Sequence, residues 1–313
     1  MATMRDIFIG EIYKRMKVDE LIFFLTADFG APALDRIRKD FKERFINVGI
    51  AEQNLINVGT GLALERFTVY AYAIAPFITM RAYEQIRNNL SLLSSVREIN
   101  VNIIGVGAGL GYDVSGPTHH CIEDITIIRN LPNILFFSPS DCELIKRFVD
   151  YSIKVKQPKY LRFDSKALPA IYGKETEIDF KTGFKILEKG EKICLVSTGY
   201  MVHTALKVKN ELEKLKIKIG VIDIFILKPL DEEKLFDILK DYSFIISLEE
   251  GFVNKGGLDS LIRTVMSRSG YCGRVLSLGM DDSYTFEVGN RETLHCKRRI
   301  DAIGIIDEIK KLI

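Results

Sequence analysis

The chain of 313 residues carries 44 basic and 42 acidic side chains, and this balance argues against a nucleic-acid-binding surface. Its 47% hydrophobic content is enough to bury two ordinary cores, so two domains are expected. Arg5 and Asp6 interrupt any signal-peptide pattern, and the most apolar run, 69–80, is too short to span a bilayer. These features predict a soluble cytoplasmic protein with no membrane segment.

Five cysteines occur singly in the sequence, and no two of them form a Cys-x-x-Cys pair. This spacing indicates neither a zinc site nor a redox dithiol. Isolated cysteines of this kind are expected to be small buried hydrophobic residues in a reducing compartment.

Helical and strand periodicities alternate along the first half of the chain. We expect helices at 4–18, 51–66, 79–95, 122–129 and 141–155, and strands at 21–26, 45–48, 67–74, 101–106, 134–137 and 160–163. Strands separated by helices require crossover connections, which favour a mostly parallel sheet.

The alternation stops at 164–182, a segment typical of a linker, and then resumes. We expect strands at 193–197, 217–222, 244–248 and 275–278, and helices at 202–215, 231–239, 257–267 and 300–312. The fold class is therefore α/β, with two doubly wound, mostly parallel-sheet domains. The predicted limits are 1–165 for the first domain, 166–183 for the linker and 184–313 for the second domain.

A carboxylate occupies the first turn of the helix expected at 51–66. Glu52 follows the strand at 45–48 and the break at Gly49, so it lies at the carboxyl end of a strand, where open α/β sheets bind their ligands. A carboxylate in this position also interacts favourably with the helix dipole. The position alone therefore leaves both a structural and a functional role open.

A glycine-rich loop follows the strand expected at 101–106. Gly105, Gly107, Gly109 and Gly111 do not fit the G-x-G-x-x-G spacing, and the sequence contains no P-loop motif. These glycines are expected to let the backbone pass close to a ligand or to another chain.

His119 comes soon after this loop and is followed by His120 and Cys121. Adjacent residues seldom point at one ion, so no metal site is expected in this chain. A histidine on a loop at the carboxyl end of a strand is well placed for proton transfer, although a lone histidine also serves as a structural residue.

Several motifs in register resemble those of transketolases. The segments 47–53 (Asn-Val-Gly-Ile-Ala-Glu-Gln), 79–87 (Thr-Met-Arg-Ala-Tyr-Glu-Gln-Ile-Arg) and 116–119 (Gly-Pro-Thr-His) resemble the pyrimidine-binding domain of that family. The segments 223–231 and 249–257 resemble its C-terminal domain. This resemblance covers essentially the whole chain and implies the thiamin-diphosphate-binding fold for the first domain.

A full transketolase also has a diphosphate-binding domain, in which a Gly-Asp-Gly motif and a downstream Asn hold Mg²⁺. No Gly-Asp-Gly occurs in this sequence. The resemblance therefore implies the C-terminal subunit of a split transketolase, active only with a separate subunit that carries the diphosphate and Mg²⁺ site. Such an enzyme uses thiamine diphosphate to transfer a two-carbon ketol unit from a ketose donor to an aldehyde or ketone acceptor in carbohydrate metabolism. A heterotetramer with two of each chain is expected.

The resemblance also assigns cofactor contacts. It makes Glu52 the carboxylate that hydrogen-bonds N1′ of the aminopyrimidine, which favours the imino tautomer that deprotonates the thiazolium. Phe77 is expected to stack on the aminopyrimidine, with Tyr72 as a fallback and a core role for Phe77 as the competing interpretation. Asp28 matches an Ala-Asp near the cofactor, and a capping role is its alternative.

Substrate contacts are expected from His119, which faces the donor ketose in the family. Transketolases of sugar phosphates have an acidic residue just before the Gly-Pro-Thr-His motif and a phosphate-binding Arg after the last strand of the domain. Here Ser115, with Asp113 upstream, and Lys166 stand nearest those positions. Because Lys lacks the planar fork of Arg, the acceptor is expected to differ from a small sugar phosphate. A phosphate ligand supplied by the partner chain would restore the standard acceptor.

Three alternatives stay open. A 2-oxo acid dehydrogenase E1 β-like subunit shares the domains and the cofactor but usually shows Gln-His-Ser where this chain has Gly-Pro-Thr-His. A 1-deoxyxylulose-phosphate synthase-like protein shares the histidine motif but is normally one chain. A non-catalytic interaction subunit would keep the fold without the chemistry. In the C-terminal domain, Glu249 and Glu250 are expected at a subunit contact.

Overall fold

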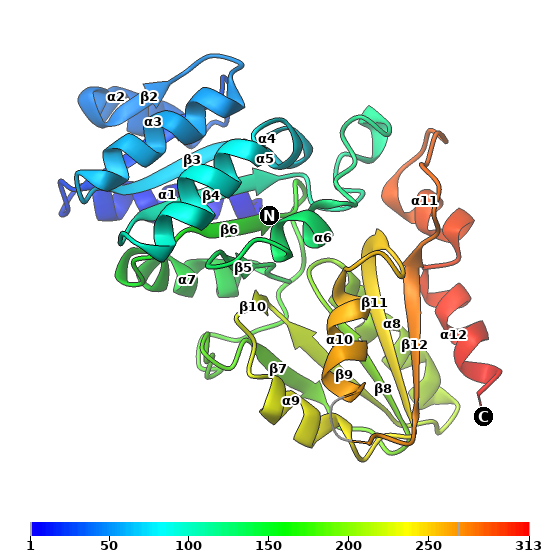
Figure 1. Ribbon diagram of the computed structural model, residues 1–313. Coiled ribbons are helices and arrows are strands. Elements are labelled where there is room, and N and C mark those ends of the chain that lie inside the picture. Colours follow the sequence, from blue (N-terminus) through cyan, green and yellow to red (C-terminus); the bar gives the residue numbers. More distant parts are fainter. Residues whose placement is uncertain (1, 268–269, 313) are drawn as a thin grey trace. The chain divides into compact units, whose positions relative to one another are not determined.

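The computed structural model describes residues 2–267 and 270–312 (Figure 1). These residues form two compact units. The first unit contains the chain up to Ala108 together with Ile127–Thr176, and the second contains Gly109–Thr126 and the chain from Glu177 onward. The segment Gly109–Thr126 thus groups with the C-terminal half of the chain, whereas the sequence placed it within 1–165. The predicted domain limits themselves stay a prediction.

The first unit is built on a parallel sheet with the strand order β5-β6-β4-β3-β1-β2. Its strands are β1 (Ile22–Thr26), β2 (Phe45–Asn47), β3 (Thr68–Ile74), β4 (Asn100–Val106), β5 (Leu135–Phe137) and β6 (Lys159–Phe163). Its helical segments are α1 (Met4–Met16), α2 (Leu34–Asp40), η1 (Lys42–Arg44), α3 (Glu52–Leu64), α4 (Ala75–Arg81), α5 (Tyr83–Gln85), η2 (Ile86–Leu92), η3 (Leu93–Ser95) and α7 (Cys142–Lys154). The chain passes back from the second unit to this one within helix α6 (Asp124–Arg129).

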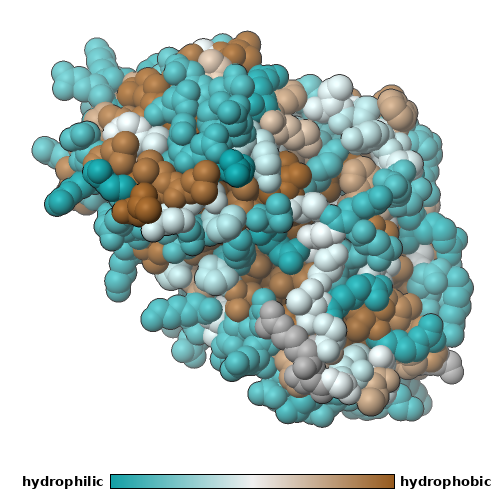
Figure 2. Space-filling model, in the orientation of Figure 1, coloured by the Kyte–Doolittle hydropathy of each residue, from teal (hydrophilic) through white to brown (hydrophobic). Residues whose placement is uncertain are grey.

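Burial in the first unit follows from the parallel topology. Strands β4 and β6 are buried at every residue, as expected where crossover helices cover both faces of a sheet. In the register of the sheet, Thr26 at the end of β1 is paired with Asn47 of β2 and Tyr72 of β3. The carboxyl ends of these three strands therefore meet at one edge. Figure 2 shows hydrophobic side chains gathered in places on the surface of the molecule, and Leu92 of η2 is among the exposed apolar side chains, at 54%.

The helix predicted at 79–95 is instead a series of short helical segments. Pro76 near its first position starts α4 early, at Ala75, because proline is preorganised for the first helical turn. Ala82 then leaves helical geometry, with φ −102° and ψ 17°, and η2 is π-helical. The early start places Phe77 and Arg81 one turn apart on α4, on the same face.

The second unit has a sheet with the strand order β12-β11-β8-β9-β7. The strands are parallel except for β7, which is antiparallel to β9. The elements of this unit are η4 (Asp113–Ser115), β7 (Phe184–Glu188), β8 (Ile193–Ser197), α8 (Met201–Lys214), β9 (Ile219–Ile224), β10 (Ile226–Lys228), α9 (Glu232–Leu239), β11 (Phe244–Phe252), α10 (Leu258–Ser267), β12 (Arg274–Met280), α11 (Arg291–Arg298) and α12 (Ala302–Lys310).

The predicted α/β class with two mostly parallel sheets is confirmed, although the sequence did not predict α2, β7, β10 or α11. The expectation of buried cysteines holds for Cys121 and Cys194 and is wrong for Cys272 and Cys296, which are exposed. Among the described residues, no helix is both long and apolar enough to cross a bilayer.

Candidate functional site

A polar turn links the ends of β1 and β2 in the first unit. The Asn47 side-chain amide donates to Asp28 Oδ1 over 2.8 Å, and its carbonyl accepts from the backbone N–H groups of Asp28 and Gly49 at 3.0 Å each. Asp28 is exposed and has a positive φ of 53°, a conformation that short polar residues tolerate. Gly49 also has a positive φ, of 76°, where a side chain would be strained. This turn fixes the path of the chain into α3.

Glu52 is the first residue of α3 and is 3% exposed. A buried carboxylate needs a partner, because an uncompensated charge in the interior is costly. The Arg81 guanidinium Nη1 pairs with Glu52 Oε2. Glu52 thus lies in the first turn of a helix that follows strand β2, as the sequence predicts.

Two aromatic side chains were candidates to stack on a bound ring, and their surroundings differ. Tyr72 is fully buried and its ring stacks on Phe29 with the ring centroids 4.9 Å apart. Phe77 is half-buried, and the Arg81 guanidinium carbon lies 5.2 Å from the centre of its ring. Phe77 therefore presents a ring face to the polar group that contacts Glu52, whereas Tyr72 is part of the core.

Lys166 lies just beyond β6 in the same unit and is exposed. Its backbone N–H donates to Asp164 Oδ1 over 2.8 Å. The two residues thus form a tight turn at the carboxyl end of β6.

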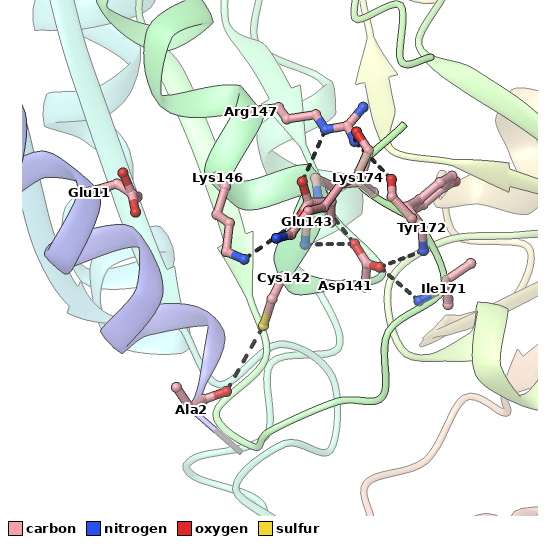
Figure 3. Close-up of polar contacts among 12 residues, drawn as sticks. Ala2, Glu11, Asp141, Cys142, Glu143, Lys146, Arg147, Ile171, Tyr172 and Lys174 are labelled. Carbon is pink, nitrogen blue, oxygen red and sulfur yellow. Dashed lines mark hydrogen bonds and ion pairs between the residues drawn. The ribbon is translucent and has the colours of Figure 1, made fainter. Parts of the chain in front are cut away.

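The segment that follows this turn is held against α7 by Asp141 and Arg147 (Figure 3). Asp141 caps α7 through Oδ1, while its Oδ2 accepts from the backbone N–H groups of Ile171 and Tyr172 at 2.8 Å each. Arg147 donates to the carbonyls of Gly173, Lys174 and Thr176. A segment without regular secondary structure is therefore fixed by side chains of one helix.

The candidate substrate residues Asp113, Ser115 and His119 share one loop of the second unit. An antiparallel bridge between Gly109 and Cys121 closes the base of this loop, with N–H to carbonyl distances of 2.9 and 2.8 Å. Gly109 has a φ of +57°, and a Cβ atom there would meet the Glu250 side chain. The glycine thus permits close approach to a side chain of its own unit, and the expected approach to a ligand or another chain stays a prediction.

Within this loop the three candidates have different exposure. Asp113 is 3% exposed, and its Oδ2 accepts from the backbone N–H of Arg291 over 2.7 Å. Ser115 is exposed, and His119 is half-buried with its Nδ1 3.1 Å from Thr118 Oγ1. Asp113 therefore anchors the loop, whereas the side chains of Ser115 and His119 are at least partly open to solvent.

A buried charge cluster holds the anchor of this loop. Glu250 accepts from Arg291 Nε over 2.7 Å, and Glu250 Oε1 lies 2.5 Å from His295 Nε2. The Arg291 guanidinium carbon is 3.8 Å from the centre of the Tyr200 ring. Burial alone would raise the pKa of Glu250, but the Arg291 charge and the His295 hydrogen bond hold that pKa well below its usual range. Glu249 caps α10 by accepting from the backbone N–H groups at 258 and 259, so both glutamates are buried within their own chain.

The structure thus brings Asp28, Glu52 and Phe77 to one sheet edge in the first unit and gathers Asp113, Ser115 and His119 on one loop of the second. Sequence reasoning assigned no role to Arg81, although it lies inside the 79–87 motif and four residues after Phe77. Among the described residues, no three His, Cys, Asp or Glu side chains cluster so as to hold a metal ion.

Comparison with known proteins identifies both halves of the chain. Residues 1–170 match the family model "Transketolase, pyrimidine binding domain", and residues 183–300 match "Transketolase, C-terminal domain". The chain belongs to the transketolase family. Transketolase pyrimidine domains imply the use of thiamine diphosphate, so this chain is a thiamine-diphosphate-dependent transketolase-type subunit.

Several curated transketolase relatives are similar over most of the chain. A subunit of the apulose-4-phosphate transketolase of Actinobacillus succinogenes is 34% identical, over 86% of this chain and 85% of its own length. A putative transketolase C-terminal section of Methanocaldococcus jannaschii is 32% identical, over 85% and 82%. The 1-deoxy-D-xylulose-5-phosphate synthase of Aquifex aeolicus is 32% identical over 97% of this chain, which spans only 47% of that relative.

Solved structures agree with these matches. A split-gene transketolase described as an inactive beta4 tetramer superposes with a TM-score of 0.85 at 29% identity, and the match covers 99% of this transketolase chain and 97% of that one. A transketolase of Pichia stipitis has the same fold, with a TM-score of 0.79 at 19% identity, and the match covers 45% of its length.

Proposed function

We propose that this chain is the pyrimidine-binding and C-terminal subunit of a split transketolase that works with a separate diphosphate-binding subunit. The enzyme transfers a two-carbon ketol unit from a ketose donor to an aldehyde or ketone acceptor. The observation that carries this proposal is that one side chain, Arg81, contacts both the buried Glu52 carboxylate and the half-buried Phe77 ring at the carboxyl edge of a parallel sheet.

The residues at this edge fit an aminopyrimidine. Glu52 supplies a buried carboxylate, which forms a strong charge-assisted hydrogen bond with a ring nitrogen in a site of low dielectric. Phe77 supplies a ring face for offset stacking. Thiamine diphosphate, when bound, supplies the carbanion chemistry that breaks and forms the carbon–carbon bond.

The protein contributes position and proton transfer. Glu52 orients the ring and holds the proton at its nitrogen, while Asn47 and Gly49 fix the backbone that leads into α3. His119 is proposed to move a proton to or from a substrate oxygen, since its ring is half-buried on a loop anchored by Asp113.

Features around Glu52 support a partner subunit. Ile50 is 77% exposed and Met80 is 44% exposed, so apolar side chains flank both Glu52 and Arg81 in the sequence. Exposed apolar side chains that gather into one patch favour contact with another protein. The similar chain from Actinobacillus succinogenes is named as a subunit, and the split-gene tetramer of beta chains is described as inactive. We place the Mg²⁺ ligands on the partner and propose two copies of each chain in a cytoplasmic heterotetramer.

The acceptor is proposed to differ from a small sugar phosphate. The family's acidic and Arg positions are matched most nearly by Ser115 and Lys166, and both side chains are exposed. The Asp113 carboxylate, two residues before Ser115, already accepts a hydrogen bond from the Arg291 backbone N–H. Neither position therefore supplies an Arg guanidinium, the planar group that binds phosphate through two N–H donors. Apulose 4-phosphate, from the name of one relative, is the first phosphorylated compound to compare with unphosphorylated and nucleotide-linked sugars.

A synthase of the 1-deoxyxylulose-5-phosphate type is the second candidate, because such a relative is 32% identical over 97% of this chain. The name of that relative gives its product as 1-deoxy-D-xylulose 5-phosphate. Formation of that product, in place of ketol transfer from a ketose donor, separates the two candidates.

The proposal is tested with the chain reconstituted with its co-purified partner, Mg²⁺ and thiamine diphosphate, using a ketose donor and a panel of aldehydes. Glu52→Gln is expected to keep cofactor binding and to lose at least about 100-fold in kcat, since general acid–base groups contribute 10²–10⁴-fold. Glu65→Gln, at the exposed far end of α3, is the matched control and should retain full activity. Full activity of Glu52→Gln, or formation of 1-deoxy-D-xylulose 5-phosphate by the wild type, would contradict the proposal.

A further inference from the structure

Arg81 contacts both groups that the proposed function assigns to the cofactor ring. Its guanidinium pairs with the Glu52 carboxylate and lies 5.2 Å from the centre of the Phe77 ring. The side chain of Glu52 is 3% exposed, whereas that of Arg81 is 46% exposed. A cation that is half in solvent therefore covers a carboxylate that the rest of the fold buries.

A guanidinium group shares the features of an aminopyrimidine that matter at this site. Both are planar, both present N–H donors at an edge, and both stack on aromatic faces. The arginine fork suits a carboxylate, and its face suits a phenyl ring. Because Glu52 is otherwise buried in its own unit, a ring that reaches its carboxylate must approach from the side that Arg81 covers.

We propose that Arg81 is a placeholder for the aminopyrimidine ring in the cofactor-free chain. Its guanidinium neutralises the buried Glu52 carboxylate while the site is empty and leaves both Glu52 and Phe77 when the cofactor binds. This inference rests on the proposed function and adds a positioning residue to it. The arrangement keeps the empty site folded but lowers the apparent affinity for thiamine diphosphate.

The position of Arg81 lets the guanidinium leave without unfolding its helix. Arg81 is the last residue of α4, and Ala82 after it is no longer helical. The final carbonyls of a helix lack intrahelical partners and attract cations. A released Arg81 side chain can therefore turn toward solvent and the end of α4, with the loss of its contacts with Glu52 and Phe77.

The size of the effect follows from the population of the paired state. A ligand that needs the open site loses apparent affinity by the fraction of molecules in which the site is open. The strength of a half-exposed ion pair lies between two extremes. Exposed pairs contribute little to stability, and buried pairs are costly to break. We expect a paired-to-open ratio of about 5 to 10 and a corresponding change in the dissociation constant.

The direct test measures thiamine diphosphate binding by isothermal titration calorimetry on the complex with the diphosphate-binding subunit and Mg²⁺. Arg81→Met keeps an apolar stem of similar length and should bind about 5- to 10-fold more tightly than the wild type. Arg87→Met removes the same charge from an exposed side chain in the nearby segment η2 and should stay within about twofold of the wild type. Equal or weaker binding by Arg81→Met would overturn the placeholder.

A second measurement uses the chain alone and needs no cofactor. Arg81→Met should raise the urea-unfolding equilibrium constant of the first unit about 5- to 30-fold, because it leaves Glu52 buried without a counter-charge. The double substitution Glu52→Gln, Arg81→Met should cost less than the two single changes combined. Additive effects would overturn the placeholder. If the wild-type complex bound no thiamine diphosphate, that result would contradict the proposed function, and this inference would fail with it.

Discussion

Removal of Arg291 is predicted to destabilise the second unit strongly. The side chains of Glu250 and Arg291 are 2% and 4% exposed, and both sit in contact with His295 or Tyr200 rather than water. Removal of one partner of a buried pair leaves an uncompensated charge and costs about 3–5 kcal/mol. Arg291→Met should therefore lower the free energy of unfolding of this unit by about that amount.

Because a chain of two units need not unfold in one step, the change is best measured by hydrogen exchange of peptides from α11 and β11 in increasing urea. Lys297→Met, an exposed position on the same helix, is the matched control and should change the free energy of unfolding by less than about 0.5 kcal/mol. If Arg291→Met behaved like Lys297→Met, the buried cluster would not stabilise the unit and the reasoning would fail.

The same cluster predicts an acid dependence. The pKa of Glu250 is lowered in the folded chain from its ordinary value of 4.5. A carboxylate with a depressed folded-state pKa adds stability above its unfolded-state pKa and loses that stability as pH falls toward the folded-state value. Unfolding of the second unit should therefore become easier as pH drops below about 4.5, and this loss should be smaller in Arg291→Met. An unchanged acid dependence in that variant would contradict the assignment.

Three further predictions concern single features of the fold. Gly109→Ala should destabilise the second unit by more than about 1 kcal/mol, because it combines a positive φ with a clash against the Glu250 side chain, and urea unfolding measures the loss. Asp141→Ala should cost about 1–2 kcal/mol through the lost helix cap alone, and hydrogen exchange should rise at residues 171–172. Cys272 should react with a thiol reagent in the native chain while Cys194 does not, as mass spectrometry of labelled peptides can show.

The Gly109 prediction has a matched comparison, and each of the three has an outcome that would contradict it. Gly61, on α3, has open space around its Cβ direction, so Gly61→Ala should be neutral or stabilising, as expected for a helix interior. Equal losses for Gly61→Ala and Gly109→Ala would contradict the steric argument. Unchanged hydrogen exchange at residues 171–172 in Asp141→Ala would contradict the capping prediction. Rapid labelling of Cys194 in the native chain would contradict the cysteine prediction.

Periodicity and composition predicted most of the architecture, because the strands of a parallel sheet occur as short apolar runs between amphipathic helices. They failed where tertiary contacts decide. Helix α11 is rich in charge, and its first residue, Arg291, is fixed by the buried Glu250. Strand β7 is a half-buried edge strand with charged residues, so it lacks a clear apolar pattern.

The candidate site was predictable to a different degree. The position of Glu52 followed from its place after a strand and from the 47–53 motif, both of which are local in sequence. The pairing of Arg81 with Glu52 and the contact of Asp113 with Arg291 join residues far apart in the chain, which no local pattern encodes. The roles of Asp28, Phe77, Ser115, His119 and Lys166 toward ligands stay predictions.

Isolation of the chain from its native source, with identification of whatever co-purifies and an assay for thiamine diphosphate, tests the central claim most directly. The split-enzyme proposal predicts a stoichiometric partner that carries a Gly-Asp-Gly motif, together with bound thiamine diphosphate and Mg²⁺. An assembly of this chain alone that takes up no thiamine diphosphate, even with Mg²⁺ and cofactor added, would contradict it and favour a non-catalytic interaction subunit.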